Sequence, residues 1–383
     1  MLARERRKDH DTAHLRLRRG GHKTASRQGS RGVTSSSRYS GSARIRGDRF
    51  LRIGIPRALM FYRYYPFLKS FLEECGCQVQ PSPPTNLKIM GEGADICVDD
   101  ICVAVKVLFG HVSHLAGKVD AILIPRLVSV EKQEYDTFTC PKLIAAPDMI
   151  RYSFPHLPAP LEFTVDVSKA PWWWGCIRLM RRLDLPLRQI VRAYPAAVRE
   201  QKRFEGLLNS GLLPADALTK MYNGNGSTLP SYLSERDVTV AVVGHPYLLG
   251  DPVVNKRLVH WLDISGARVL GSTMLSESDL QREASRLPPL SWSYERELLA
   301  AASHFLKRVD VDGVIYLTSF GCGPDSLVTE IVRRELEPAG DQVLLELVLD
   351  EHSAESGVRT RAEAFVDLLR RRKMVRSDVG RER

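Results

Sequence analysis

The segment 319–326, Ser-Phe-Gly-Cys-Gly-Pro-Asp-Ser, constrains the fold most, because it predicts a sharp turn from a strand into a helix. The apolar run 313–317 before it is typical of a buried strand. Apolar residues then recur on one helical face over 327–336, and Pro324 suits a first helical turn. Cys322 therefore lies near the positive end of a helix dipole, which favours a thiolate. The octapeptide fits a tight turn with an incidental cysteine equally well.

Strands and helices alternate along most of the remaining chain. The first half predicts a strand over 52–57 that ends in a turn, a strand near Val79, and a strand at 121–124 that ends at Pro125-Arg126. It predicts helices at 59–74, from about 86, and at 96–109 closed by Gly110. The pattern over 171–225 is helical. The second half predicts strands at 238–243, 268–270, 313–317 and 343–349, and helices at 253–265, 293–308 and 359–371. This alternation is typical of an α/β fold with parallel sheets.

We therefore expect two Rossmann-like parallel-sheet units with a helical connecting segment, flanked by disordered basic tails. The expected boundaries are a disordered basic arm at 1–49, a first α/β unit at 50–168, a helical connector at 169–235, a second α/β unit at 236–371 and a basic tail at 372–383.

The net charge of +10 is confined to the ends of the chain. Residues 1–50 contain 14 Lys and Arg against four Asp and Glu, which accounts for the whole excess. The segment 51–369 is slightly acidic, so we expect no nucleic-acid partner for the folded part, although a basic arm could bind RNA or acidic surfaces. No apolar run approaches the roughly 18 residues that a membrane span requires.

Seven cysteines, an odd number, and the lack of a secretory apolar region at the N-terminus predict a reducing, cytoplasmic location. Cys102 shares a helix face with Lys106 in the predicted helix, Cys140 is followed by a proline, and Cys322 lies on the glycine corner. Three cysteines from distant parts of two α/β units would suit an iron–sulfur cluster held between them, with one iron left open. Cys75, Cys77, Cys97 and Cys176 are expected to be core or surface residues.

Polar residues at strand ends form a second group of candidates, because functional residues of open α/β sheets gather at the carboxyl ends of strands. The segments 125–126, 244–246, 321–323 and 350–352 all lie at such ends and could face one crevice. Lys106, His245, Glu351 and His352 could supply charge or protons there, or could only cap strands and bind loop backbone. A cysteine hydrolase using Cys322 and His352 competes with this interpretation, but it lacks the G-x-S-x-G spacing and leaves Cys102 and Cys140 unexplained.

Several motifs together resemble the activase-related domain of the 2-hydroxyacyl-CoA dehydratase and benzoyl-CoA reductase superfamily. They are Gly-Ile-Pro-Arg-Ala-Leu (54–59), Ile-Pro-Arg-Leu-Val-Ser-Val-Glu (124–131), Cys-Pro-Lys (140–142), Gly-His-Pro-Tyr (244–247), Phe-Gly-Cys-Gly-Pro-Asp (320–325) and Asp-Glu-His-Ser (350–353). The resemblance covers about 51–369. Val103-Ala104 stands where a proline usually follows the first cysteine, and His245 stands in place of the usual arginine.

The resemblance implies a [4Fe–4S] cluster held by Cys102, Cys140 and Cys322, which would accept electrons from an ATP-dependent activator. The sequence contains no G-x-x-x-x-G-K-[ST] phosphate loop, so the activator is expected to act in trans. The resemblance also implies an acyl-CoA substrate and a dehydratase-like role. The alternative is a non-catalytic scaffold or regulatory binding protein that retains the fold.

Overall fold

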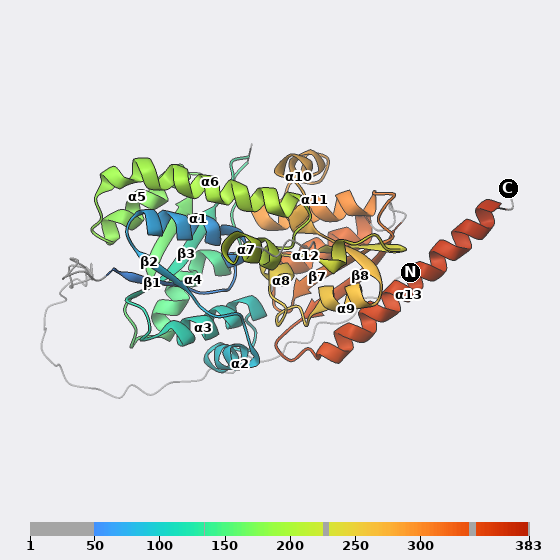
Figure 1. The fold of residues 1–383 in the computed structure, drawn as a ribbon, viewed down its shortest axis with the longest axis horizontal. Helices are drawn as coiled ribbons and strands as arrows, with labels where there is room; N and C mark the ends of the chain where they lie inside the picture. The colour runs from blue at the N-terminus through green and yellow to red at the C-terminus, as the bar shows by residue number, and fades with distance from the viewer. Residues whose placement is uncertain (1–49, 134, 225–229, 337–341, 382–383) are drawn as a thin grey trace, which may run out of the picture. The chain divides into compact units, whose positions relative to one another are not determined.

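The computed structural model describes residues 50–133, 135–224, 230–336 and 342–381. The basic arm expected at 1–49 lies outside the described residues. The described part contains two four-stranded sheets, which confirms the predicted α/β class with two Rossmann-like units (Figure 1). The exact unit boundaries stay a prediction.

The two sheets have the same strand order, β2-β1-β3-β4 and β6-β5-β7-β8, and all the pairs are parallel. In each sheet, the second strand along the chain pairs with one edge of the first strand, and the third strand pairs with the other edge. Such a reversal makes a switch point between the two central strands, where ligands bind in doubly wound folds. The strands are β1 (Arg52–Ile55), β2 (Gln78–Pro81), β3 (Ala121–Ser129), β4 (Leu161–Asp166), β5 (Val238–Val243), β6 (Ala267–Gly271), β7 (Gly313–Ser319) and β8 (Val343–Leu349).

The connector is helical, as predicted, and its longest helix covers the first unit. Helix α6 runs beside α1, and the two pack together through apolar side chains (Figure 1). The helices of the first unit and connector are α1 (Phe61–Glu74), α2 (Leu87–Ile96), α3 (Val103–Leu115), α4 (Pro141–Ser153), α5 (Trp172–Arg182), α6 (Ile190–Asn209) and α7 (Pro214–Tyr222), with 3-10 turns at Leu187–Gln189 and Ser231–Leu233.

Helices alternate with the strands of the second unit, and one long helix follows its last strand. They are α8 (Pro246–Gly250), α9 (Leu258–Ile264), α10 (Glu277–Ala284), α11 (Ser293–Leu306), α12 (Gly323–Ile331) and α13 (Glu355–Arg381), with a 3-10 turn at Ser272–Met274 and a π-helical turn at Val332–Leu336. Helix α13 therefore continues past the predicted end near 371 into the expected basic tail. No proline interrupts this stretch, and Lys373 donates to the Asp237 carbonyl oxygen at 2.6 Å.

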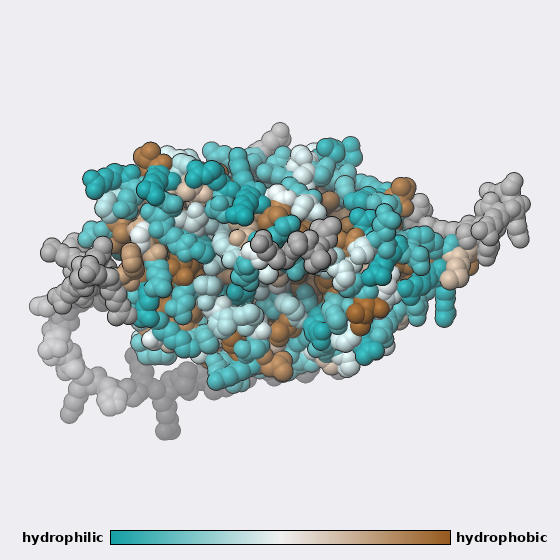
Figure 2. Space-filling view, in the orientation of Figure 1, coloured by the Kyte–Doolittle hydropathy of each residue, from teal (hydrophilic) through white to brown (hydrophobic). Residues whose placement is uncertain are grey.

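Central strands β5 and β7 are buried along their whole length, as expected for parallel strands covered on both faces. Their side chains belong to two apolar clusters, and the larger of these also contains residues from the first sheet. The face shown in Figure 2 is mostly hydrophilic, with scattered apolar residues. None of the described helices combines the length and apolar character that crossing a bilayer would take.

The predicted end of the strand at 121–124 is wrong, and two elements of the first unit were not predicted. Strand β3 does not end at Pro125-Arg126 but runs to Ser129. Its pairing with β1 involves only Ala121 and Ile122, so the edge that faces β1 is unpaired at Pro125, whereas Pro125 lies opposite Phe163 of β4 on the other edge. The strand β4 and helix α4 were missed, although Leu161, Phe163 and Val165 alternate with polar residues.

The helix predicted at 96–109 is confirmed only over 103–109, because residues 97–102 form a loop between α2 and α3. Gly110 does not end a helix but lies inside α3, where α2 crosses it. A Cβ on Gly110 would lie 1.9 Å from the Ile89 carbonyl oxygen, and one on Gly93 would lie 1.9 Å from that of Lys106. These glycines allow the close crossing of the two helices, and this crossing supports the loop that carries Cys102.

Gly110→Ala should therefore destabilise the protein. Added atoms in a packed site cost about 1–3 kcal/mol, and more where backbone must move. Gly91, also in α2, has no neighbouring atom within 4 Å of an added Cβ, so Gly91→Ala should stabilise the protein by about 0.5–1 kcal/mol. Urea unfolding of both variants measures the difference. Equal effects at the two positions would contradict a sterically close α2–α3 crossing.

Candidate metal centre

Cys102, Cys140 and Cys322 line one cavity of about 280 Å³. Each occupies the same kind of position, directly before the first residue of a helix: Cys102 before α3, Cys140 before α4 and Cys322 before α12. A water molecule takes about 30 Å³, so the cavity has room for a group of several atoms. The three cysteines selected from the sequence therefore meet, although they lie far apart along the chain.

The glycine corner brings Cys322 against the loop before Cys102. Gly321 has a φ of +76°, and an added Cβ would lie 2.9 Å from the Asp100 carbonyl oxygen. A residue with a side chain is strained at this φ and would push the two loops apart. Lys142, in the first turn of α4, donates to the Gly321 carbonyl oxygen at 2.5 Å. This contact joins the Cys140 helix to the Cys322 corner.

Two opposing effects act on these thiols. The N-termini of α3, α4 and α12 carry partial positive charge, which favours an anionic group in the cavity. Burial nevertheless dominates for the thiols by themselves: it raises the pKa of Cys140 to about 11 and that of Cys322 well above its usual range. Both are therefore protonated at neutral pH, and metal binding would have to release those protons.

His245 and Glu295 line the same cavity. His245 lies between β5 and α8, and Glu295 lies in the first turn of α11. The Cys322 sulfur, a His245 ring nitrogen and a Glu295 carboxylate oxygen all lie within 4.8 Å of one another, and all three residues are buried. Burial raises the pKa of Glu295. The sequence did not single out Glu295, because an acidic residue in a first helical turn is ordinary.

The remaining candidates lie outside the lining of this cavity. The buried Lys106 is hydrogen-bonded to Glu351 and donates to the Asp99 carbonyl oxygen at 2.8 Å. The His352 side chain is 86% exposed. Arg126 contacts Asp148 and Glu162 rather than the cavity. Of the four polar candidates, only His245 lines this cavity.

The other four cysteines also lie outside the lining of the cavity. Cys75, Cys77 and Cys176 are buried in the apolar core, and Cys97 is half-buried in the loop before Cys102.

The family model described as the CoA enzyme activase uncharacterised domain matches residues 52–275, more than half of the chain. The chain belongs to this family. The match includes Cys102, Cys140 and His245 and ends before Cys322. No curated protein matches the chain. Among solved structures, the C-terminal domain of glucosamine-fructose-6-phosphate aminotransferase from Francisella tularensis is similar at 12% identity, covering 84% of this chain and 82% of that chain with a TM-score of 0.19.

A second, larger cavity of about 780 Å³ adjoins the cysteine cavity in this family member. The turn 244–247 separates the two, because Gly244 and Pro246 line the larger cavity while His245 and Tyr247 line the smaller one. Helix α11 is shared in the same way: Glu295 lines the cysteine cavity, whereas Arg296 and Glu297 line the larger one.

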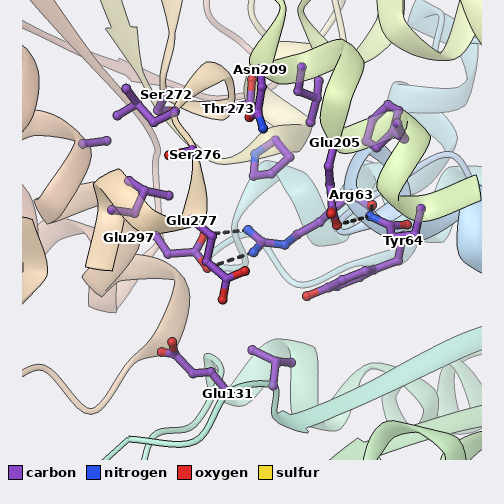
Figure 3. Close-up of a pocket in the computed structure, with 18 of the residues that line it drawn as sticks. Arg63, Tyr64, Glu131, Glu205, Asn209, Ser272, Thr273, Ser276, Glu277 and Glu297 are labelled. Carbon is purple, nitrogen blue, oxygen red and sulfur yellow. Dashed lines mark hydrogen bonds and ion pairs between the residues drawn. The ribbon is translucent and has the colours of Figure 1, made fainter. Parts of the chain in front are cut away.

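Ion pairs cross the larger cavity of this family member. Figure 3 shows the Arg63 guanidinium facing Glu297, with N–O distances of 2.5 and 2.8 Å, and Tyr64 beside it. Arg296 forms a second ion pair with Glu131, with an N–O distance of 2.6 Å. Hydroxyl groups of Ser272, Thr273 and Ser276 line another wall (Figure 3). Both arginines are thus neutralised by carboxylates of the cavity itself.

Proposed function

We propose that this CoA enzyme activase domain protein is an iron–sulfur electron-transfer component, with a [4Fe–4S] cluster held by Cys102, Cys140 and Cys322. The observation that carries the proposal is the convergence of these cysteines, each at a helix N-terminus, on one cavity. Three thiols are a suitable donor set for such a cluster with one iron left without a protein thiolate. The three helix ends favour the negative charge that thiolate ligation brings.

When bound, the cluster would carry single electrons and offer one iron to a substrate or solvent molecule. The protein's own residues would bind it, limit solvent access and tune its electronics. Apolar side chains of Leu59, Met60 and Val105 line the cavity and reduce water access. Cys102 and Cys322 are nearly buried, with 5% and 6% exposure, so a partner would reach the group only at the mouth of the cavity.

The larger cavity is the candidate chamber for a substrate of the acyl-CoA class. It adjoins the cysteine cavity across a single turn, and it offers aromatic side chains and hydroxyl groups. Arg63 and Arg296 are already paired, so this chamber suits an uncharged acyl or pantetheine segment better than phosphate groups.

The cluster of anaerobically reconstituted protein should be reduced by an ATP-dependent activator from the same genome, in the presence of reductant and ATP. The chain's own sequence contains no phosphate loop with which to couple nucleotide hydrolysis to electron transfer. EPR spectroscopy before and after mixing measures the reduction, and ADP in place of ATP is the control. A loaded cluster that no activator reduces would overturn the electron-transfer role and favour a non-catalytic scaffold.

A further inference from the structure

Glu295 and His245 are buried polar residues that line the cysteine cavity, and each has a buried atom without a hydrogen-bond partner in the described part of the chain. Glu295 is 1% exposed and His245 is 3% exposed. Within the described residues, Glu295 Oε2 and His245 Nδ1 have no hydrogen-bond partner. His245 Nε2 and Glu295 Oε1 lie 3.9 Å apart, too far for a hydrogen bond. The two side chains are therefore close together without satisfying each other.

Such an arrangement is costly unless something else binds there. A buried polar atom without a hydrogen-bond partner is destabilising, because it has lost its hydration and gained nothing in return. The neighbouring Arg296 and Glu297 pair with Glu131 and Arg63 around the other cavity. The stacking of His245 on Tyr247, with ring centroids 5.1 Å apart, limits rotation of the imidazole. The two side chains are thus held ready for a cation.

The position of Cys322 identifies the kind of cation. Its sulfur lies within 4.8 Å of both the His245 nitrogen and the Glu295 oxygen. Protein ligands lie about 2.0–2.3 Å from a bound Zn²⁺ ion, so two donors on one tetrahedral ion are about 3.3–3.8 Å apart. His245 Nε2 and Glu295 Oε1, at 3.9 Å, are already close to this range, and the triad as a whole would have to close by up to about 1 Å. A sulfur, a nitrogen and an oxygen donor suit Zn²⁺ or Fe²⁺ better than Mg²⁺ or Ca²⁺.

We propose that Cys322, His245 and Glu295 form a mononuclear site for one divalent transition-metal ion. Binding exchanges the Cys322 thiol proton for the metal, and the thiolate and carboxylate together balance the two positive charges of the ion. Three protein ligands leave a fourth position open, as in catalytic rather than structural zinc sites. This inference does not depend on the proposed function, but both use Cys322, so one chain can hold the mononuclear ion or the cluster and not both at once.

The test uses the full chain, stripped of metal under anaerobic conditions and titrated with Co²⁺ as a spectroscopic probe. Wild type should bind one Co²⁺ per chain with a sulfur-to-cobalt charge-transfer band. Glu295→Gln and His245→Gln should each weaken binding by more than about tenfold, the least that loss of a ligand is expected to cost. Both substitutions keep the side-chain size roughly similar, and circular dichroism checks that each variant folds. Cys140→Ala, which alters only the cluster set, should leave Co²⁺ binding unchanged.

The mononuclear site and the cluster predict opposite results for Glu295→Gln and Cys140→Ala, so the failure of one proposal can be distinguished from the failure of the other. Glu295→Gln should still load a full cluster, whereas Cys140→Ala should not. Zn²⁺ bound first should block cluster loading in wild type and do so less in Glu295→Gln. Co²⁺ binding that survives Glu295→Gln, or that disappears in Cys140→Ala, would overturn the mononuclear site without touching the cluster proposal. Loss of cluster loading in Glu295→Gln would contradict the separation of the two sets.

Discussion

Cys140→Ala protein should retain almost no iron or labile sulfide after anaerobic reconstitution, and Cys102→Ala and Cys322→Ala should behave in the same way. Each change removes one of the three cysteines that we propose as cluster ligands, and the remaining two would hold a cluster poorly. Iron and sulfide analysis per chain, with the absorption spectrum, measures the loss. This is the largest functional effect that we expect from any single substitution in the chain.

Two other cysteines provide matched controls for this experiment. Cys176 is fully buried in the apolar core, and Cys97 is half-buried in the loop that leads to Cys102. Cys176→Ala and Cys97→Ala should keep the iron content of wild type and cost only packing, about 1 kcal/mol for a small core side chain. Full iron retention in Cys322→Ala would reject the assignment of the cluster ligands, and loss of iron in Cys176→Ala would mean that the readout reports folding.

Lys106→Met should destabilise the protein by about 3–5 kcal/mol, the usual cost of removing one partner from a buried ion pair. The Lys106 and Glu351 side chains are only 4% and 12% exposed, and Lys106 also donates to the Asp99 carbonyl oxygen. The pair joins α3, which begins just after Cys102, to the loop that follows β8. Urea unfolding measures the loss, and Lys69→Ala, which breaks the more exposed pair with Glu73, should cost at most about 1 kcal/mol.

The pH dependence of the same pair gives a second readout. Burial by itself raises the pKa of Glu351, but the hydrogen bond and charge of Lys106 outweigh burial and hold the pKa below its ordinary value of 4.5. A lowered carboxyl pKa adds stability that is complete above the ordinary pKa and is lost as the pH falls through the folded-state value. The stability difference between wild type and Lys106→Met should therefore shrink below pH 4.5. A difference that stays constant down to pH 2 would contradict this assignment of the charge interaction.

Helices and strands could be predicted from the sequence mainly where the pattern of apolar residues is long and periodic. The central strands β5 and β7 and the helix α11 were predicted close to their observed bounds, because they are strongly apolar and are bounded by turn residues. The loop at 97–102 was not predicted, because the apolar residues on both sides of Asp99-Asp100 were interpreted as one buried helix. The helix crossing at Gly93 and Gly110, which positions that loop, depends on contacts between backbones and leaves no periodic signal.

The sequence by itself determined the local geometry of Cys322, which lies between two glycines before a proline, because these neighbours specify a turn into a helix whatever surrounds them. Cys140 also precedes a proline, but the helix α4 that begins there was not predicted. Only the tertiary structure decided which side chains share the cavity. It brought Glu295 to Cys322 and His245, paired Lys106 with Glu351, and left His352 exposed. The physical reason is the distance along the chain over which each interaction acts. Caps and turns depend on adjacent residues, whereas the cavity forms where loops from both sheets pack together. No short motif specifies that packing.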